Sequence, residues 1–284
     1  MLDESYRKSV FDRASQIEVQ HDAQYESAVK QILAFGTEKS DRTGTGTLSL
    51  FGLHMTFNLE NDVFPLVTTK STWFKGIAYE LLWMLNGDTN IKYLTDNGVH
   101  IWDEWADKDG NLGPVYGEQW RHAIGQMHHV DQIQNAIDLL KNDPTSRRIV
   151  VDSWQLTALD KMALSPCHCL FQFWSDGEWL SCQLYQRSAD FGLGVPFNIA
   201  SYSLLTRMMA QQTGLKPKEF IWSGGDCHVY LNHIEPLLKQ ISYKPYPYPT
   251  LTIDRADDIF SYKYEDFHLH NYKHWPKIKM EVSV

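Results

Sequence analysis

The segment of residues 168–185 constrains the fold most, because it predicts two strands joined by a tight turn. Residues 168–175 and 179–185 are both rich in aromatic and aliphatic side chains, and Asp176-Gly177 lies between them. An Asp-Gly pair between two such runs is typical of a β-hairpin, since glycine readily adopts the positive φ angles of tight turns. The chain therefore contains a strand pair, and its fold must build a sheet around it.

Helical and strand-like patterns alternate irregularly through the rest of the chain. Apolar and polar residues alternate over 48–59, which predicts a strand with one buried face. Further helices are predicted over 77–85, 130–140 and 201–213, further strands at 149–154 and 251–253, and a polar turn over 224–230. Because these elements follow no regular βαβ order, we expect a single α+β domain with a mixed sheet. We place this domain at 25–284, after a polar extension of residues 1–24 that is helical or loose.

Composition excludes several classes of protein. The 284 residues carry 35 acidic and 26 basic side chains, and this net charge of −9 argues against general nucleic-acid binding. No apolar run approaches the roughly 20 residues of a membrane-spanning helix. Four cysteines are too few for a disulfide scaffold, and the charged first residues do not resemble a secretory signal, so we expect a cytoplasmic protein. Cys167 and Cys169 lack the second cysteine pair of a zinc site, so we expect no metal.

Two residues are candidates for chemistry on their own. Cys167, in Ser-Pro-Cys-His at the start of the predicted hairpin, is a nucleophile if nearby positive charge favours the thiolate. A buried structural cysteine is the alternative. Glu80 lies in the otherwise apolar helix 77–85, where burial would raise its carboxyl pKa into the range of acid–base chemistry. The alternative for Glu80 is an ordinary exposed position.

Arginines and glycines indicate a site for a small anion. Arg42 lies in the loop 40–47, whose glycines let backbone N–H groups approach a ligand, and Arg147, Arg148 and Arg187 adjoin predicted strands. Guanidinium groups match phosphate oxygens in two-point geometry. Taken singly, each arginine is equally well explained as a solvated surface charge.

Two further segments suit a flat heterocycle. Trp102 and Trp105 can form an aromatic wall against which such a ring stacks. Asn198 carries an amide that donates and accepts hydrogen bonds at once. It can instead cap the helix that follows it.

Taken together, these segments resemble the thymidylate synthase family. The matching blocks occur in order from about Tyr25 to Val284. They are Ser-Asp-Arg-Thr-Gly-Thr-Gly-Thr (40–47), Glu-Leu-Leu-Trp (80–83), Gly-Asp-Thr-Asn-Ile (87–91), Ile-Trp-Asp-Glu-Trp (101–105), Ser-Arg-Arg-Ile (146–149), Pro-Cys-His (166–168), Gln-Leu-Tyr-Gln-Arg-Ser (183–188), Pro-Phe-Asn-Ile-Ala-Ser-Tyr (196–202) and Gly-Gly-Asp-Cys-His-Val-Tyr (224–230).

The resemblance implies reductive methylation of dUMP to dTMP by a homodimer whose sheets pack back to back. It implies that 5,10-methylenetetrahydrofolate supplies both the carbon and the hydride and leaves as dihydrofolate. Cys167 would add to C6 of the uracil ring and so activate C5.

The family's roles carry over position by position. The resemblance implies that the catalytic residues are Cys167, Glu80, Tyr116, Arg187, Asp190 and Asn198. It implies that dUMP is bound by Arg42, Arg187, Ser188, Asn198, His228 and Tyr230, with Arg147 and Arg148 donated across the dimer interface. It implies that the folate contacts Ile101, Trp102, Trp105, Asp190, Gly194, Phe197 and Val284, the last of which seals the site.

Three alternatives stay open. A deoxyuridylate hydroxymethylase shares the first half of the reaction but captures the one-carbon intermediate with water, whereas Trp102 and the apolar tail favour water exclusion. A catalytically silent or RNA-binding homologue would keep the fold without the chemistry. A Cys–His hydrolase would pair Cys167 with His168, although adjacent residues on a strand point to opposite faces.

Overall fold

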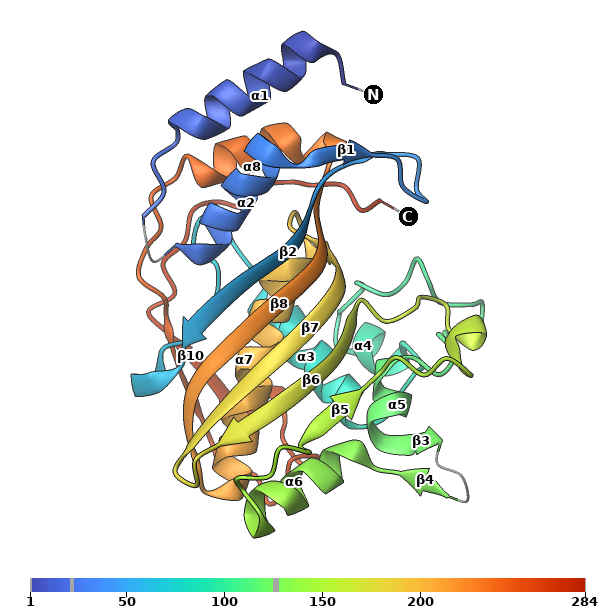
Figure 1. The fold of residues 1–284 in the computed structure, drawn as a ribbon. Helices are drawn as coiled ribbons and strands as arrows, with labels where there is room; N and C mark the ends of the chain where they lie inside the picture. Colours follow the sequence, from blue (N-terminus) through green and yellow to red (C-terminus); the bar gives the residue numbers. More distant parts are fainter. Residues whose placement is uncertain (1, 21–22, 125–127, 284) are drawn as a thin grey trace.

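The computed structural model describes residues 2–20, 23–124 and 128–283 as an α+β fold around one six-stranded sheet (Figure 1). The strand order is β1-β2-β8-β7-β6-β5. These strands are β1 (Thr37–Lys39), β2 (Thr47–Asn58), β5 (Val150–Asp152), β6 (His168–Ser175), β7 (Trp179–Asp190) and β8 (Lys216–Tyr230). All neighbours are antiparallel except β7 and β8, which run parallel. Two small sheets pair β3 (Ala123–Ile124) with β4 (His129–Val130) and β9 (Thr250–Ile253) with β10 (Phe267–His270).

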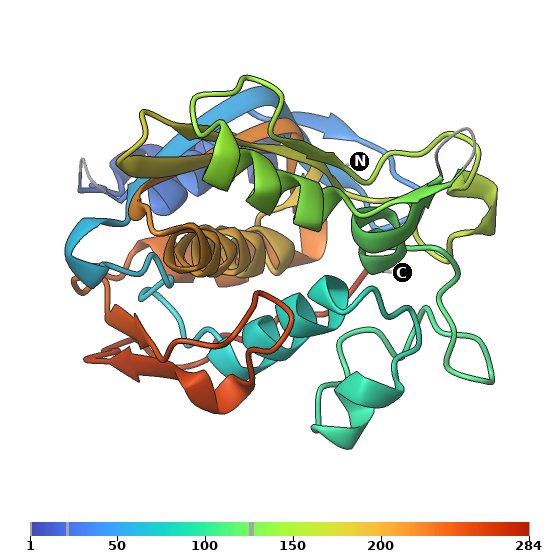
Figure 2. The same ribbon diagram turned by 90° about the horizontal axis from the view of Figure 1, so that it is seen from below.

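Helices cover one face of the large sheet. They are α1 (Glu4–Gln16), α2 (Gln24–Phe35), α3 (Phe74–Leu85), α4 (Lys92–Asp96), α5 (Tyr116–His122), α6 (Gln132–Asn142), α7 (Gly194–Thr213) and α8 (Ile234–Ile241). The structure also has 3₁₀ helices at η1 (Glu60–Asp62), η2 (Leu159–Lys161), η3 (Leu231–His233) and η4 (Tyr264–Asp266). Figure 2 shows α7 end-on, between the sheet and a layer that contains α3 and the β9–β10 pair. Because α7 is covered on both sides, most of its residues are buried.

The predicted α+β class and the predicted hairpin are confirmed. β6 and β7 pair antiparallel, and Gly177 between them has a φ of +96°. The predicted strand over 48–59 is β2, and the helix predicted over 77–85 is α3, which begins three residues earlier at Phe74. The helix predicted over 130–140 is α6, displaced to Gln132–Asn142.

Two local predictions were wrong. α7 begins at Gly194 rather than at Ser201, so Asn198 lies inside the helix and does not cap it. Pro196 is compatible with this early start because a first-turn residue needs no N–H donor. Residues 224–230 form the end of β8 and not a turn. A Cβ atom on Gly224 would come within 2.1 Å of the Trp222 ring, so this glycine reflects close packing inside a strand.

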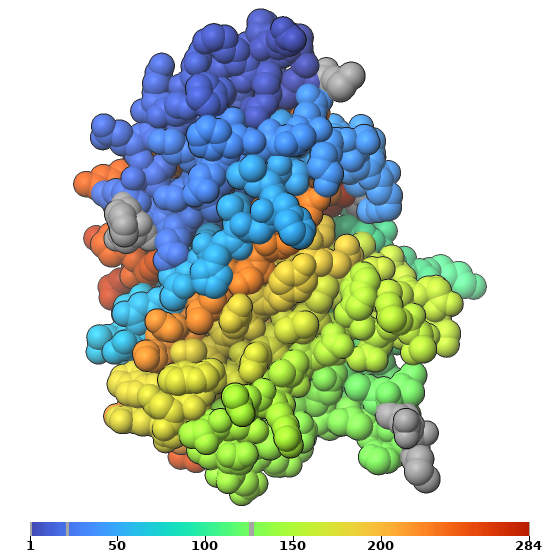
Figure 3. Space-filling view, viewed as in Figure 1, coloured from blue at the N-terminus to red at the C-terminus, as the bar shows by residue number. Residues whose placement is uncertain are grey.

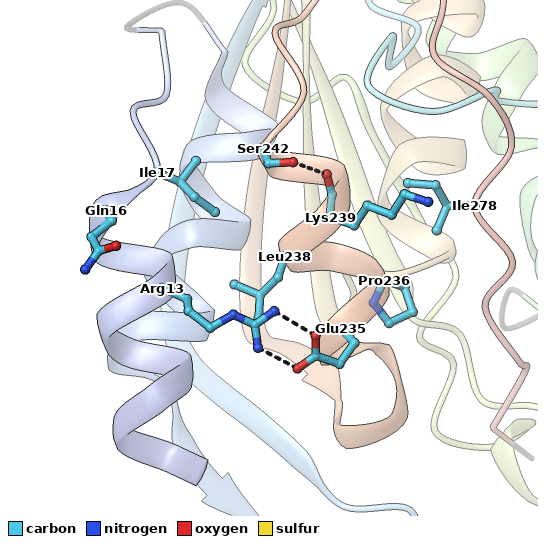
Figure 4. A pocket seen from close by; sticks show the side chains of 9 residues that line it. All are labelled: Arg13, Gln16, Ile17, Glu235, Pro236, Leu238, Lys239, Ser242 and Ile278. Carbon is cyan, nitrogen blue, oxygen red and sulfur yellow. Dashed lines mark hydrogen bonds and ion pairs between the residues drawn. The ribbon is translucent and has the colours of Figure 1, made fainter. Parts of the chain in front are cut away.

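The amino-terminal extension contains a helix that packs on α2 and α8. Figure 4 shows Arg13 of α1 making two hydrogen bonds of 2.7 Å to the carboxylate of Glu235 on α8. Arg7 donates to the carbonyl oxygens of Leu33 (2.8 Å) and Gly36 (2.7 Å), which satisfies carbonyls at the end of α2. Of the two possibilities for the start of the extension, helical or loose, the structure shows a helix.

Candidate active site

The topology brings several chain segments together at one end of the strands of the sheet. β7 ends at Asp190, and its parallel neighbour β8 ends at Tyr230. β6 and β2 are antiparallel to these strands, so they begin at the edge where β7 and β8 end. Cys167 directly precedes β6, and the loop 40–46 directly precedes β2. α7 also begins here, beside the carboxyl ends of the parallel strands β7 and β8. Ligands commonly bind at such a place.

Cys167 is held by backbone and side-chain contacts on both sides. Its N–H donates to the Tyr116 hydroxyl oxygen (2.8 Å), and its carbonyl oxygen accepts from the Arg187 N–H (2.9 Å). The Arg187 guanidinium donates to the carbonyl oxygens of Pro166 (2.8 Å) and Ser165 (3.0 Å). Cys167 is partly exposed as a residue, so it is not sealed inside the core, and its backbone is fixed.

Burial and the charges around Cys167 both act on the pKa of its thiol. Burial raises the pKa of the thiol, Arg187 and then Arg42 lower it, and Asp190 raises it further. The net shift is upward, so the group rests as a thiol. Arg187 also lies over the ring of Trp154, with 4.9 Å between the guanidinium carbon and the ring centroid, a contact that sequence reasoning missed.

Glu80 faces an aromatic cluster. The Trp102 indole N–H donates to Glu80 Oε1 (2.8 Å), and the Trp102 ring lies 5.8 Å from Trp105 and 6.0 Å from Tyr116. Burial raises the pKa of the Glu80 carboxyl to about 7, against the smaller effect of the Trp102 hydrogen bond. This carboxyl can therefore both give and take a proton near neutral pH.

The contacts of His168 do not suit it to act as a base for Cys167. Its Nδ1 is hydrogen-bonded to the hydroxyl of Tyr202 on α7 (2.7 Å), and its ring stacks on Tyr116 at 4.0 Å. Burial lowers the pKa of His168 to about 3, so it is neutral at physiological pH. These contacts argue against the Cys–His hydrolase.

The amide of Asn198 is oriented by two side chains that sequence reasoning did not single out. The Trp222 indole N–H donates to Gln186 Oε1 (2.9 Å), and Gln186 Nε2 donates to Asn198 Oδ1 (3.0 Å). An indole nitrogen only donates, so it fixes which way the Gln186 amide faces, and Gln186 in turn fixes Asn198. The Asn198 oxygen accepts this one bond and keeps a second lone pair for a ligand N–H, and its NH₂ group is left for a ligand acceptor.

Asp190 and Gly194 adjoin Asn198. Burial raises the pKa of Asp190, but His233 and then His228 outweigh it, so the net shift is downward and the carboxylate is ionised. A Cβ atom on Gly194 would lie 3.8 Å from Asn198 and 3.9 Å from Asp190, which places this glycine between the two.

The remaining predicted residues differ in placement. His228 and Tyr230 end β8 with their ring centroids 5.2 Å apart, and burial, Asp190 and Asp41 raise the pKa of Tyr230 whereas Arg42 lowers it. Ser188 lies on β7, Ile101 precedes Trp102, and Phe197 lies in the first turn of α7. Arg147 and Arg148 are exposed beside β5, at the far side of the sheet from β1, and make no ion pair within the described part of the chain. Val284 lies outside the described residues.

A cavity of about 700 Å³ lies elsewhere, between α1, α8 and the carboxyl-terminal segment. Its lining includes Arg13, Glu235 and Ile278, and none of the candidate site residues. Among residues 2–20, 23–124 and 128–283, no group of three histidine, cysteine or acidic side chains is placed to hold a metal ion. No helix in the same ranges is long and apolar enough to cross a membrane.

Comparison with known proteins identifies the family of the chain. The thymidylate synthase family model matches residues 23–284, which include the sheet, α7 and the carboxyl-terminal segment. Such a family carries out thymidylate synthase-type methyl transfer, with dUMP and methylenetetrahydrofolate as the implied substrates. The chain belongs to the thymidylate synthase family.

Proposed function

We propose that the chain catalyses reductive methylation of dUMP to dTMP, with 5,10-methylenetetrahydrofolate as the second substrate. The observation that carries this proposal is the position of Cys167. Cys167 is partly exposed and lies within electrostatic reach of Arg187 and Arg42, at the end of the sheet where α7 begins and carries an Asn198 amide that is already oriented.

In this proposal the phosphate of dUMP binds first to the arginines. Arg42, Arg187 and Ser188 of one subunit hold it, together with Arg147 and Arg148 of the other subunit. The exposed position of the last two supports their reaching a neighbouring chain. Burial of dUMP orients the uracil ring over Cys167 and its amide edge toward Asn198, while His228 and Tyr230 bind the sugar hydroxyl.

Cys167 then acts as the nucleophile. Its thiol gives its proton to solvent, and the sulfur bonds to C6 of uracil while the C5–C6 π electrons shift toward C5 and O4. The free NH₂ group of Asn198 donates to the developing charge on O4. The amide pair of Asn198 fits uracil, whose O4 accepts and whose N3–H donates, and disfavours cytosine, which has the opposite pattern.

Glu80 and Tyr116 handle protons in this account. The Glu80 carboxyl has a pKa of about 7, which suits proton transfer to and from groups at O4. The Tyr116 hydroxyl lies against the Cys167 backbone and supports the removal of the proton from C5.

The other residues fit a folate. When bound, that molecule supplies a one-carbon unit and a hydride. Trp102 and Trp105 offer aromatic faces, Ile101 and Phe197 are partly buried apolar neighbours, and Gly194 leaves room beside Asp190. The ionised Asp190 carboxylate is an acceptor for the N–H groups of a pterin ring. We keep the prediction that Val284 seals this side.

The outer face of the sheet supports a homodimer. Figure 3 shows strands of the sheet uncovered on this face, where Phe51, Leu170, Trp174 and Tyr185 are 38–84% exposed. Leu170 and Tyr185 are directly paired across β6 and β7. Such an apolar patch is typical of an interface, and a second copy packed against it gives the back-to-back dimer.

Subunit mixing tests the shared site. We expect Cys167→Ala and Arg147→Ala/Arg148→Ala each to be inactive. Mixed after reversible dissociation, they should regain roughly a quarter of the wild-type activity, because half of the dimers then hold one intact site. No recovery in verified mixed dimers would contradict arginine donation.

A deoxyuridylate hydroxymethylase is the closest alternative. Product analysis separates the two, because the proposed reaction oxidises the folate to dihydrofolate and the alternative releases tetrahydrofolate. We expect near-ultraviolet absorbance of dihydrofolate to rise in step with dTMP. Hydroxymethylated product without dihydrofolate would overturn the proposal.

Asn198→Asp tests how the pyrimidine is recognised. A protonated or ionised carboxyl can accept from the amino group of cytosine, so this variant should turn over dCMP and lose at least about tenfold in kcat/KM for dUMP. Asn198→Ala is the matched control and should gain no dCMP activity. An unchanged preference for dUMP in Asn198→Asp would contradict this recognition.

A further inference from the structure

The carboxyl-terminal tail, residues 271–283, is attached firmly in its first half, where Tyr272 and Trp275 contact the rest of the molecule, and more loosely beyond Trp275. Most of its residues are exposed, and it contains no helix or strand. Trp275 anchors its first half through N–H groups that donate to the carbonyl oxygens of Thr68 and Lys244 (both 2.9 Å). In Figure 1 the tail ends near the upper end of the sheet, close to β1.

Beyond Trp275, two hydrogen bonds hold the described part of the tail. His233 Nε2 bonds to the carbonyl oxygen of Glu281 (2.7 Å), and the hydroxyl of Thr45 bonds to that of Ser283 (3.3 Å). A carbonyl oxygen only accepts, so His233 Nε2 carries the proton. The His233 imidazole therefore donates the shorter of these two hydrogen bonds.

His233 is a rigid anchor. Its side chain is fully buried at the end of η3, and its ring centroid lies 5.7 Å from that of Tyr230. A Cβ atom on Gly192 would lie only 2.2 Å from His233 Nδ1, so the turn between β7 and α7 closes directly over the ring. The ring cannot turn without moving this backbone.

The other nitrogen of this ring faces the candidate site. His233 Nδ1 lies 3.8 Å from Asp190 Oδ1 and is buried without a hydrogen-bond partner. Asp190 instead accepts from the Gly192 N–H (2.7 Å). Nδ1 has only an electrostatic contact with Asp190, so among the described residues the one hydrogen bond of this buried ring is the Nε2 bond to the tail.

We propose that His233 is a positioning residue, which fastens the tail at Glu281 and so holds it beside Asp190 at the side of the site where the folate binds. Met280 also packs against the core, and the His233 donor adds a short hydrogen bond that must break when the tail opens. The location of the folate rests on the proposed function. The attachment of the tail does not.

Three variants separate the donor from the shape of the ring. His233→Phe keeps an aromatic ring and removes the donor, whereas His233→Gln keeps an N–H donor at a similar reach. Thr45→Val removes the weaker bond. The rate of trypsin cleavage after Lys277 and Lys279, which are exposed in the tail, measured without substrates, reports the closure of the tail in each protein.

We expect cleavage in this segment to be about fivefold to tenfold faster in His233→Phe, while His233→Gln stays within about twofold of the wild type. Equal cleavage of His233→Phe and the wild type would overturn the proposal. Faster cleavage within the sheet as well would mean unfolding. In that case the wild type decides: a His233 Nε2 proton protected from solvent, seen by nitrogen-15 NMR, supports the anchor, and an unprotected one overturns it.

Kinetics give the second readout. In His233→Phe we expect the KM for methylenetetrahydrofolate to rise about tenfold with the KM for dUMP unchanged, and His233→Gln should restore most of the loss. Equal changes in both KM values would contradict a role at the folate side. If His233→Phe loosens the tail but the wild-type protein does not turn over dUMP, the proposed function is refuted, whereas the role of His233 as an anchor is not.

Discussion

The two sides of the candidate site are built in different ways. On the sheet side, Tyr116, Gln186 and His168 are buried, and each is fixed by hydrogen bonds to a neighbouring buried group or to the Cys167 backbone. On the opposite side, the tail 271–283 is mostly exposed, and beyond Trp275 its described part is held by two hydrogen bonds and the packing of Met280.

The two sides therefore suit two different tasks, which are the reaction itself and the entry and release of ligands. Side chains that meet the reacting atoms must hold their geometry to within fractions of an ångström, and burial with paired polar groups supplies that. A segment that admits substrates and releases products must open at little cost, and a few exposed hydrogen bonds supply that. Substitutions on the sheet side should therefore abolish turnover, whereas those at the periphery should change it modestly.

The largest effect is expected at Cys167. Cys167→Ala should lower kcat by at least about 10⁴-fold, because no other group can form the bond to C6. Thermal unfolding should change little, since the Cys167 contacts to Tyr116 and Arg187 come from its backbone. Cys169→Ala, two residues away and buried, is the control and should stay active. An active Cys167→Ala enzyme would place the nucleophile elsewhere.

Glu80→Gln should have the next largest effect. We expect kcat to fall about 10²- to 10³-fold, with loss of the inflection near pH 7 in the pH–rate profile. Because folding raises the pKa of Glu80 from 4.5 to about 7, its contribution to stability is complete below pH 4.5 and is lost as the pH rises through 7. Glu80→Gln should therefore gain stability relative to the wild type above pH 7. A wild-type pH profile that persists in this variant would argue against its role.

His168 tests the buried side through stability. Folding lowers its pKa from 6.5 to about 3, so the stability that it contributes is present above pH 6.5 and is lost as the pH falls toward 3. Between these values it adds a slope of about 1.4 kcal/mol per pH unit to the free energy of unfolding. His168→Phe cannot titrate, so in urea titrations its stability should fall less steeply with acid. Parallel slopes would mean that His168 is protonated in the folded state.

The smallest effect is expected at the amino-terminal helix. Arg13 and Glu235 are both about half exposed, so Arg13→Ala should reduce the free energy of unfolding by no more than about 1 kcal/mol, and less in high salt. Lys8→Ala, which breaks the exposed pair with Asp12, is the matched control. A loss of several kcal/mol at Arg13 would show that the periphery is as tightly coupled as the sheet.

The elements with a clear period could be predicted from the sequence. The Asp176-Gly177 turn located the β6–β7 hairpin, and alternation over 48–59 located β2. The start of α7 and the end of β8 were missed, because Pro196 and Gly224 usually interrupt structure. Whether such residues interrupt an element depends on neighbours that only the folded chain brings together.

The candidate site shows the same limit. Motifs could name Cys167 and Asn198, but the residues that orient them act through contacts distant in the sequence. Trp222 reaches Gln186 across 36 positions, and His233 reaches Glu281 across 48. Neither Trp222 nor His233 carries a local signal that distinguishes it from an ordinary core residue.

Mass spectrometry of a trapped complex tests the central claim most directly. The protein is incubated with 5-fluoro-dUMP and methylenetetrahydrofolate, digested, and its peptides are sequenced. Because fluorine replaces the proton that must leave C5, we predict a stable adduct of nucleotide and folate on Cys167 alone. An unmodified Cys167 peptide in protein that turns over dUMP, or an adduct on another side chain, would contradict the account.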